Sequence, residues 1–261
     1  MRYVLEHKNE AERLETQAKI PQYSIKSEMS RLKIKDGARV LDAGCGTGVL
    51  SRYVHDTYSN IDVDGFDYSE LRVAEAKKRI KGTHYKVNFF QDNIEAMQAF
   101  SESYDVIVSR YVIEHLANPK AAIHEMARLL KPGGILYIID FDGIFINLHS
   151  ENKRFNFLLD KIKAGFKSDL YIGRKLPAYF YEAGLENIEY DVSAVQFKGE
   201  DAELEYSNNR QRCLNCHKEF SRILDSSDLA DEFNHLYLQE SIHPGGVLFY
   251  NKFIVSGMKK S

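Results

Sequence analysis

The chain has 261 residues, a length that fits one domain or one domain carrying a lid. Hydrophobic residues make up 44% of it, which allows a sizeable core and argues against global disorder. The 35 Lys and Arg nearly balance the 38 Asp and Glu, for a net charge of −3. This balance provides no electrostatic footprint for a nucleic-acid backbone, and we expect no nucleic-acid partner.

The apolar runs and the cysteines indicate the compartment of the protein and whether it spans a membrane. Residues 1–10 lack the apolar core of a secretory signal, and the richest apolar run, residues 135–141, is too short to span a bilayer. The three cysteines are too few for a disulfide scaffold. We therefore expect a soluble protein of the reducing cytoplasm. Nothing in the sequence predicts its oligomeric state.

From residue 38 onward, short apolar runs alternate with helical patterns. The alternation is typical of βαβ units, and the continuously apolar strands indicate a parallel sheet covered on both faces. Strands are expected at residues 39–41, 61–66, 85–90, 104–109 and 135–141. Helices are expected from the glycine-rich turn to about residue 58, and over residues 69–81, 93–100 and 119–130.

The last of these helices has the clearest boundaries. Asn118 is its expected N-cap and Pro119 its first residue. Residues 131–134, Lys-Pro-Gly-Gly, end the helix and turn the chain. One apolar stripe at i, i+3, i+4 and i+7 consists of Ile123, Met126, Ala127 and Leu130.

The rhythm changes after Asp142. Residues 144–183 and 201–240 are predicted to be mainly helical, and strands are predicted at residues 188–197 and 247–256. A charged helix at residues 6–19 has no place in the sheet. We expect one domain over residues 1–261, divided into a helical cap (1–35), a cofactor-binding core (36–142), two helical lid segments (143–183 and 200–242) and the last strands (186–198 and 247–257).

A glycine-rich turn follows the first expected strand, with Gly44, Gly46 and Gly48 at alternate positions. Glycines let the backbone approach a ligand there, and the next helix start offers unpaired N–H groups. Dinucleotide sites favour G-x-G-x-x-G, and Asp42 would repel a pyrophosphate. An acid at this place suits the ammonium and sulfonium of S-adenosylmethionine (SAM). The alternative is an ordinary tight turn.

Two further acids end the next two strands. Asp67 comes about twenty residues after the loop, where an acid accepts hydrogen bonds from both ribose hydroxyls. Asp92, followed by Asn93 and Ile94, can accept a hydrogen bond from an adenine amine. Because the carboxyl ends of parallel strands converge on one crevice, the three acids together favour a SAM site over a chance arrangement.

Several segments resemble a known family. Residues 40–48 resemble motif I of the class I SAM-dependent methyltransferases, and residues 63–69 resemble the acidic second motif. Residues 104–109 with residues 114–116 (Glu-His-Leu) resemble the fourth-strand motif, and residues 128–134 are similar to the motif that follows it. The nearest group is the ubiquinone/menaquinone-biosynthesis-like methyltransferases of small molecules.

The resemblance implies an α/β, Rossmann-like sheet of seven strands, mostly parallel with the last strand antiparallel. It implies SAM as the cofactor and S-adenosylhomocysteine as the product, and a charged N-terminal helix, here residues 3–17, often covers the cofactor in such families. The long helical piece between the sixth and seventh strands replaces the usual hairpin, so these helical lid insertions leave the acceptor undetermined. The expected cofactor contacts are Asp42, Ala43, Gly44, Cys45, Gly46, Gly48, Asp67, Tyr68, Asp92, Asn93, Ile94 and Arg110.

Methyl transfer from a sulfonium is an in-line displacement, so the protein mainly positions donor and acceptor. A base is needed only when the acceptor is a poorly acidic O–H or N–H. His115, just after the fourth strand, is the candidate catalytic base, and the alternative is a structural role at a helix start. Arg110 and Tyr111 follow the same strand and Asp142 ends the fifth; each either faces the ligands or packs within the fold.

The second half of the chain is rich in aromatic residues. We expect residues 144–183 and part of the insert after residue 200 to form a lid over an apolar or aromatic acceptor. For most of the aromatic side chains, packing in the lid's own core is the favoured interpretation. They are Phe145, Phe155, Phe157, Phe166, Tyr171, Tyr179, Phe180 and Tyr181.

Cys213, Cys216 and His217 match the C-x-x-C-H pattern of haem attachment, and such a cluster also occurs in zinc sites. Haem attachment needs an export signal, and structural zinc needs four ligands, for which no second pair lies nearby. A buried helical stripe explains the cysteines better, and we expect no metal. The residues at that spacing are Cys213, Cys216, Phe220, Ile223 and Leu224.

The leading hypothesis is therefore an enzyme that methylates a small molecule. An RNA or protein methyltransferase is a second possibility, opposed by the charge balance and by the lack of an appended basic domain. A third is a SAM-binding module without catalysis, which only an acceptor assay separates from an enzyme. A nicotinamide dehydrogenase is disfavoured by the glycine spacing and by Asp42.

Overall fold

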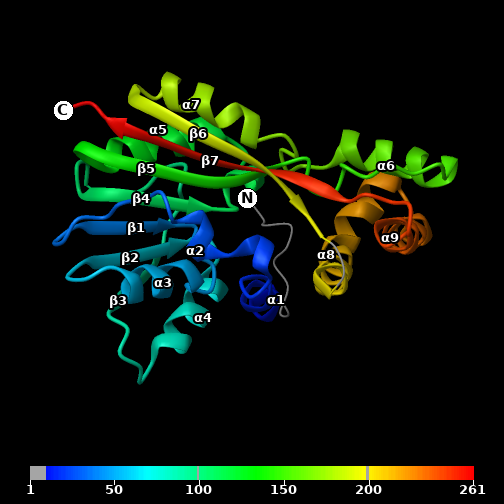
Figure 1. The fold of residues 1–261 in the computed structure, drawn as a ribbon, viewed down its shortest axis with the longest axis horizontal. Helices are drawn as coiled ribbons and strands as arrows, with labels where there is room; N and C mark the ends of the chain where they lie inside the picture. The colour runs from blue at the N-terminus through cyan, green and yellow to red at the C-terminus, as the bar shows by residue number, and fades with distance from the viewer. Residues whose placement is uncertain (1–9, 99, 198–199) are drawn as a thin grey trace.

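A single seven-stranded sheet organises the computed structural model, which describes residues 10–98, 100–197 and 200–261 (Figure 1). The strand order is β3-β2-β1-β4-β5-β7-β6. All neighbouring strands are parallel except that β7 runs antiparallel to both β5 and β6, which confirms the predicted topology. The strands are β1 (Arg39–Ala43), β2 (Asp62–Asp67), β3 (Val87–Gln91), β4 (Tyr104–Arg110), β5 (Leu130–Asp142), β6 (Leu185–Gln196) and β7 (Phe249–Lys259).

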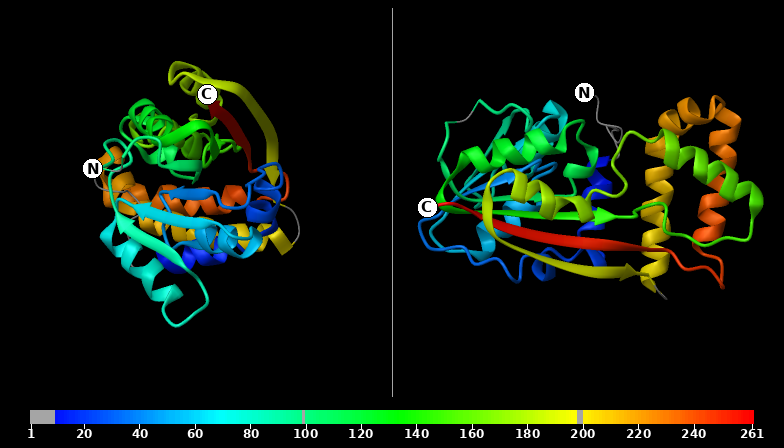
Figure 2. Two further views of the ribbon diagram at one scale, coloured as in Figure 1. Left: turned by 90° about the vertical axis from the view of Figure 1, so that its left-hand side faces the viewer. Right: turned by 90° about the horizontal axis from the view of Figure 1, so that it is seen from above.

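The helices fall into two groups. One group lies along the sheet, and α6, α8 and α9 form a separate helical layer beyond one end of it (Figures 1 and 2). The α-helices are α1 (Glu10–Gln17), α2 (Ile25–Glu28), α3 (Val49–Thr57), α4 (Glu70–Ile80), α5 (Pro119–Leu129), α6 (Lys153–Gly165), α7 (Leu176–Glu182), α8 (Glu200–Leu224) and α9 (Ser227–Ser241). Short 3₁₀ turns are η1 (Pro21–Tyr23), η2 (Ile113–His115) and η3 (Gly173–Lys175).

Three apolar clusters hold these layers together. Helices α5 and α7 cover one cluster, with Met126 and Phe180 fully buried against the sheet. Helices α3 and α4 contribute to a second cluster through residues such as Val54. The third cluster joins α6, α8 and α9 around Phe155 and Phe233. The third cluster also includes Phe141, Val195 and Tyr250 of β5, β6 and β7, so the helical layer packs against the ends of these strands.

Helix α5 forms where its boundary signals place it. The Asn118 side chain accepts a hydrogen bond from the Ala121 N–H at 3.1 Å, and Pro119 occupies the first turn. Three residues of the predicted stripe are buried within α5, namely Ile123, Met126 and Ala127. The helix ends at Leu129, and Leu130 already belongs to β5.

The prediction of a helix over residues 93–100 is wrong. Residues 93–98 and 100 are not helical, and residue 99 lies outside the described residues. Asp92 accepts hydrogen bonds from the N–H groups of Asn93 and Gln98, and Asn93 accepts one from the N–H of Glu95. Such short-range bonds from Asp and Asn side chains satisfy the backbone in a turn and compete with a helix.

Two other predictions need adjustment. The N-terminal helix is described from Glu10, and residues 6–9 of the predicted helix lie outside the described residues. Residues 144–183 are helical only in α6, η3 and α7. The Asn152 side chain accepts from two backbone N–H groups and thereby caps the start of α6. The segment before that cap is a loop with an isolated bridge between Leu148 and Leu248.

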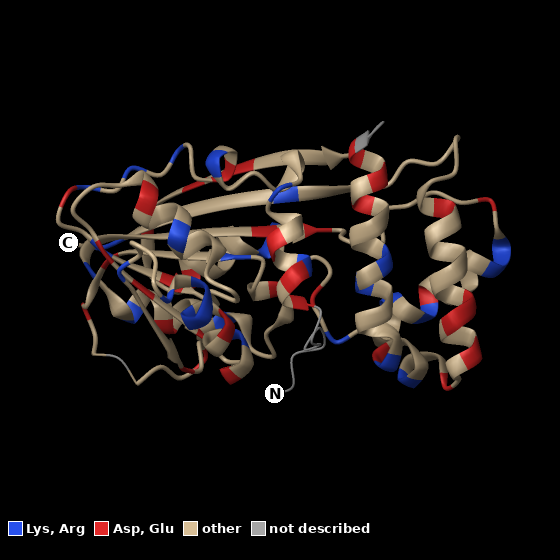
Figure 3. Cartoon of the chain, turned by 90° about the horizontal axis from the view of Figure 1, so that it is seen from below, with Lys and Arg blue, Asp and Glu red and all other residues tan. Residues whose placement is uncertain are grey.

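The surface charges are mixed. Figure 3 shows Lys and Arg interspersed with Asp and Glu along both the sheet and the helical layer. Among the described helices, none combines the length and the apolar character that crossing a membrane requires.

Candidate active site

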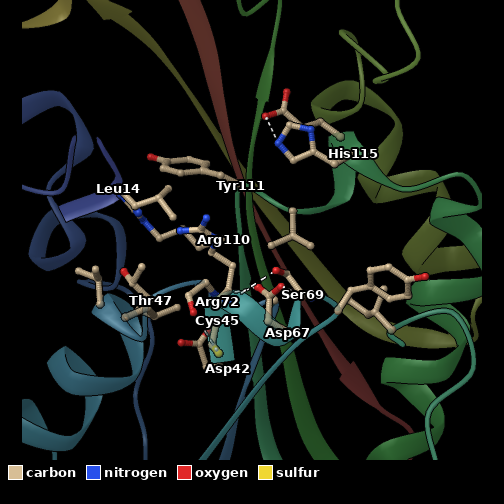
Figure 4. A pocket seen from close by; sticks show the side chains of 18 of the residues that line it. Leu14, Asp42, Cys45, Thr47, Asp67, Ser69, Arg72, Arg110, Tyr111 and His115 are labelled. Carbon is tan, nitrogen blue, oxygen red and sulfur yellow. Dashed lines mark hydrogen bonds and ion pairs between the residues drawn. The ribbon is translucent and has the colours of Figure 1, made fainter. Parts of the chain in front are cut away.

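A cavity of about 250 Å³ opens at the carboxyl ends of the parallel strands. Its wall comes from the glycine loop, from the residues after β2 and β4, and from helices α1 and α8. In Figure 4, Asp42, Cys45 and Asp67 lie on one side, Tyr111 and His115 lie on the other, and Arg110 lies between them. Ligands of open α/β sheets bind at this edge.

The glycine loop is tightly constrained. The Gly44 N–H donates to the Phe66 carbonyl oxygen at 2.9 Å, which folds the loop back onto β2. Gly44 has a φ of +81°, and a Cβ there would lie 2.5 Å from Val112. Gly48 caps α3 with a φ of +75°, and a Cβ there would lie 2.5 Å from the Phe89 ring. Only glycine fits these two positions, which explains the spacing that the sequence shows.

Asp42 provides a buried carboxylate at the base of the cavity. It accepts a hydrogen bond from the Ser51 hydroxyl at 2.5 Å. Burial raises the pKa of Asp42 to about 6; the Ser51 hydrogen bond opposes the shift and the charge of Asp67 adds to it. The group is thus mainly ionised at neutral pH, and it lies within electrostatic reach of Arg110.

Asp67 ties three elements together. One carboxylate oxygen accepts from the Gly46 N–H at 2.9 Å, and the other accepts from the Ser69 N–H at 2.9 Å. Ser69 in turn is the N-cap of α4, since its side chain accepts from the Arg72 N–H. The carboxylate therefore holds the glycine loop beside the end of β2, facing the cavity (Figure 4).

The other predicted cofactor residues divide into two sets. In the described structure, Ala43, Gly48 and Asp92 do not line the cavity, since Ala43 packs in the core below the loop and Asp92 bonds to the backbone that follows it. The remaining predicted residues that the structure brings to the wall are Asp42, Gly44, Cys45, Gly46, Asp67, Tyr68, Asn93, Ile94 and Arg110.

Arg110 is held by a buried acid that sequence reasoning missed. Its Nε donates to Glu28 at 2.6 Å, and its Nη2 donates to the Tyr23 carbonyl oxygen at 2.8 Å. The Tyr111 hydroxyl and the Lys252 ammonium also donate to Glu28. Although burial raises the pKa of Glu28, the two cations outweigh it and the pKa is lowered. Glu28 therefore carries a charge inside the protein and fixes Arg110 and Tyr111 at the cavity.

His115 and Glu114 face the other side of the cavity from η2. The Nδ1 of His115 lies 3.2 Å from the Ser168 hydroxyl, and its Nε2 lies 3.4 Å from Glu114. Burial, with the charges of two arginines, lowers the pKa of His115 to about 3, so the imidazole is neutral at physiological pH. Burial and the neighbouring Asp140 raise the pKa of Glu114 well above its usual value. His115 is thus a neutral and weakly basic imidazole at the cavity wall.

The comparisons with known proteins identify the family. A family profile described as "Methyltransferase domain" matches residues 34–184, more than half of the chain. The chain belongs to the methyltransferase domain family. The matched segment contains the glycine loop, Asp67, Arg110 and His115, and it ends before β6.

A curated relative and two solved structures show how far the likeness extends. The malonyl-[acyl-carrier protein] O-methyltransferase of Enterobacter lignolyticus is 37% identical over 108 residues, which cover 41% of this chain and 41% of the relative. Phosphoethanolamine N-methyltransferase 2 of Haemonchus contortus, solved with SAM, aligns over 98% of this chain and 59% of its own at a TM-score of 0.63 and 18% identity. The [4+2]-cyclase SpnF aligns over 90% of this chain and 78% of its own at 0.57 and 21%. These two structures establish the fold of the methyltransferase domain and leave its chemistry open.

The aromatic residues of the predicted lid of the methyltransferase domain belong mainly to cores or to the surface. Phe155 and Phe180 are fully buried, whereas Phe157, Tyr171 and Tyr181 are exposed. Phe145, Phe166 and Tyr179 pack against the apolar clusters. None of these eight lines the described cavity, to which the second half of the chain contributes Phe141, Ile144 and Arg212 instead.

Asp142 also lies away from the described cavity wall. It accepts a hydrogen bond from Arg174 at 2.6 Å, which links the end of β5 to η3. The predicted cysteine stripe is confirmed, because Cys213 and Cys216 are buried on α8 beside Phe220. Burial raises the pKa of Cys213 to about 12, which keeps the thiol protonated.

One group of potential metal ligands lies outside the site. His55, Asp56 and His84 converge at the C-terminal end of α3, the end away from the glycine loop. Asp56 is hydrogen-bonded to His84 at 2.8 Å and to the Tyr85 hydroxyl at 2.9 Å. The His55 Nε2 accepts from a backbone N–H, which favours the tautomer with a proton on the nitrogen nearest Asp56. Hydrogen bonds therefore account for Asp56 and for the His55 Nε2, whereas the His55 Nδ1, 3.6 Å from Asp56, has no hydrogen-bond partner among the described residues.

Proposed function

We propose that this methyltransferase domain transfers the methyl group of SAM to a small-molecule acceptor and releases S-adenosylhomocysteine. The observation that carries the proposal is one cavity that holds a buried acid, Asp42, and a partly buried cation, Arg110, beside Asp67 at the end of the next strand. An amino-acid group needs both signs of charge, with its ammonium toward Asp42 and its carboxylate toward Arg110.

The rest of the cofactor fits the neighbouring wall. Asp67 provides a carboxylate for the ribose hydroxyls, as acids at this strand end do in nucleotide sites. Ile94 offers an apolar surface for the adenine, and Asn93 and Tyr68 lie beside it. Asp92 then supports the turn that carries Asn93, because it accepts from the backbone N–H of that residue. We assign Ala43 and Gly48 the same indirect role.

The chain's own contribution to catalysis is alignment. Bound SAM supplies an electrophilic methyl group on a sulfonium. Holding the acceptor in line with it accounts for about 7–11 kcal/mol of barrier reduction in favourable cases. Where the acceptor is an O–H or N–H, His115 takes the proton at one of its ring nitrogens; with a pKa of about 3 it is a weak base, so it accepts the proton only as methyl transfer makes that proton acidic. For an acceptor that is already acidic, His115 only orients it.

The acceptor side has an apolar wall. Tyr111 stacks on Phe141 with ring centroids 4.4 Å apart and lies under the Arg110 guanidinium on its other face, so the two rings turn their edges to the cavity, beside Ile144. Helices α1 and α8 close the cavity over it. An apolar or aromatic body of small size therefore suits the space, and a folded RNA or protein does not. We take the whole chain to serve as one domain in the cytoplasm, where its three free cysteines stay reduced.

Two measurements test the proposal. Titration calorimetry should show one site for S-adenosylhomocysteine, and a product-release assay with a panel of metabolites should show S-adenosylhomocysteine formed above background. Absence of cofactor binding would refute the site. Binding without turnover on every acceptor would favour the SAM-binding module without catalysis.

A further inference from the structure

Helix α8 brings a buried arginine to the acceptor side of the cavity. Arg212 lines the cavity and is 5% exposed. Its Nη1 donates to Glu205 at 3.0 Å and to Asn209 at 2.7 Å, and its Nη2 donates to the Tyr23 hydroxyl at 3.4 Å. A guanidinium has five N–H donors. These bonds leave the Nε hydrogen and one Nη2 hydrogen without an acceptor among the described residues.

The acid that pairs with Arg212 has other donors. Glu205 accepts from the hydroxyls of Tyr23 and Tyr250 and from the side-chain amide of Asn208. Three neutral groups thus stabilise its charge in addition to Arg212. The network fixes the guanidinium in place and does not use up its hydrogen-bonding capacity, which is the arrangement of a prepared anion site.

The surroundings do not oppose a negative ligand. Burial and Asp140 raise the pKa of Glu114 well above its usual value, which favours the uncharged carboxyl, and His115 is neutral. The charge of Arg212 reaches both groups. Arg13 of α1 also lines the cavity, but its described bonds engage it with Glu10, Gln17 and Asn208.

Arg212 lies close to this apolar wall. The Tyr23 ring packs edge-on against Tyr111 and Phe141, with centroids 6.0 and 5.8 Å away, and its hydroxyl accepts from Arg212. We propose that the methyl acceptor carries a carboxylate, which Arg212 binds while the acceptor's apolar body lies against the edges of Tyr111 and Phe141 and beside Ile144. The two open donors lie on adjacent nitrogens, as a carboxylate with two oxygens requires. This inference rests on the proposed function and narrows its substrate class.

The experiment compares matched acids and amides on protein saturated with S-adenosylhomocysteine. Benzoate and cinnamate are titrated against benzamide and cinnamamide by calorimetry. We expect the acids to bind at least about tenfold more tightly, since hydrogen bonds between charged groups are about twice as strong as neutral ones. Arg212→Met should abolish this preference, and Arg212→Lys should retain part of it. Arg222→Met is the control, because Arg222 is on the same helix and pairs with Glu219 at the surface.

The outcomes separate this inference from the proposed function. If the wild-type protein does not bind S-adenosylhomocysteine, the proposed function fails. If it binds S-adenosylhomocysteine but shows no preference for the acids, or binds none of the four probes, the carboxylate assignment is overturned. A preference that survives Arg212→Met also overturns it. Unchanged affinity of that variant for S-adenosylhomocysteine shows that it is folded, and Arg212→Lys decides the question if it is not.

Discussion

Asp67→Ala is the most direct test of the cofactor site. In the structure the Asp67 carboxylate faces the cavity and accepts from two backbone N–H groups at 2.9 Å. With cofactor bound, we expect it to accept from the ribose hydroxyls as well. Losing hydrogen bonds to a charged group costs about 1.5–3 kcal/mol. The affinity for S-adenosylhomocysteine should therefore fall by roughly 10- to 150-fold.

The same carboxylate also holds the Gly46 N–H, so the substitution loosens the loop. That part of the effect appears as a loss of stability, and a loss of 1 kcal/mol lowers the melting temperature by about 2–4 °C in a protein of this size. Asp67→Asn keeps one oxygen as an acceptor and should lie between the alanine variant and the wild type in both measurements.

Titration calorimetry with S-adenosylhomocysteine measures the affinity, and circular dichroism measures the melting temperature. Asp105→Ala is the matched control, because Asp105 also accepts from a backbone N–H, that of Arg39 at 2.8 Å, and does not line the described cavity. A folded Asp67→Ala protein that binds S-adenosylhomocysteine as tightly as the wild type would refute the assignment of this carboxylate.

Three further predictions concern the loop, the buried acid and pH. Gly48→Ala should lower the free energy of unfolding by about 2–4 kcal/mol, because of left-handed backbone strain and overlap with the Phe89 ring. Gly82→Ala shares the φ of +75° but has open space around it, and should cost only about 1–2 kcal/mol. Equal losses of stability for the two variants in urea unfolding would contradict this account. Glu28→Gln leaves two buried cations uncompensated and should cost about 3–5 kcal/mol, whereas a change below 1 kcal/mol would show that the charge is dispensable. The ammonium group of the ligand binds the ionised form of Asp42, whose pKa is about 6. The affinity for S-adenosylhomocysteine should therefore be highest above pH 6 and fall by up to about tenfold per pH unit below it. Asp42→Asn should remove this pH dependence.

The cofactor side could be predicted because its chemistry lies at strand ends. Asp42 and Asp67 end neighbouring parallel strands, and the sheet brings them together whatever the rest of the chain does. Asp92 follows the same rule, yet its carboxylate bonds to its own turn. The rule predicts where a residue lies, and local hydrogen bonds decide which way its side chain points.

The acceptor side could not be predicted in the same way. Glu28 meets Arg110 from 82 positions away, on a four-residue helix whose place no periodicity defines. Arg212 is adjacent to Cys213, which the helical spacing correctly assigns to the buried stripe of α8. Successive residues of a helix point about 100° apart, so this stripe leaves Arg212 directed elsewhere, and only the packing of α8 on α1 shows where.

Tyr23 connects the two sides through one side chain and its carbonyl. The carbonyl oxygen accepts from Arg110, and the hydroxyl donates to Glu205 and accepts from Arg212. Burial, with the charge of Glu205, raises the pKa of Tyr23, so the phenol keeps its proton. A cofactor that moves Arg110 should therefore also move Tyr23 and change its hydrogen bond with Arg212. We expect S-adenosylhomocysteine to tighten benzoate binding through this link.

Tyr23→Phe tests this link, because it removes the hydroxyl and keeps the ring packing. We expect the fold to remain, at a cost of about 0.5–1.5 kcal/mol for the lost hydrogen bond. The affinity for S-adenosylhomocysteine alone should stay close to that of the wild type. The ratio of benzoate affinities with and without S-adenosylhomocysteine measures the coupling between the two ligands, and it should approach one. Tyr250→Phe also removes a hydroxyl that bonds to Glu205, but Tyr250 has no bond to Arg110 among the described contacts. Equal coupling in the two variants would show that the connection runs through another part of the fold.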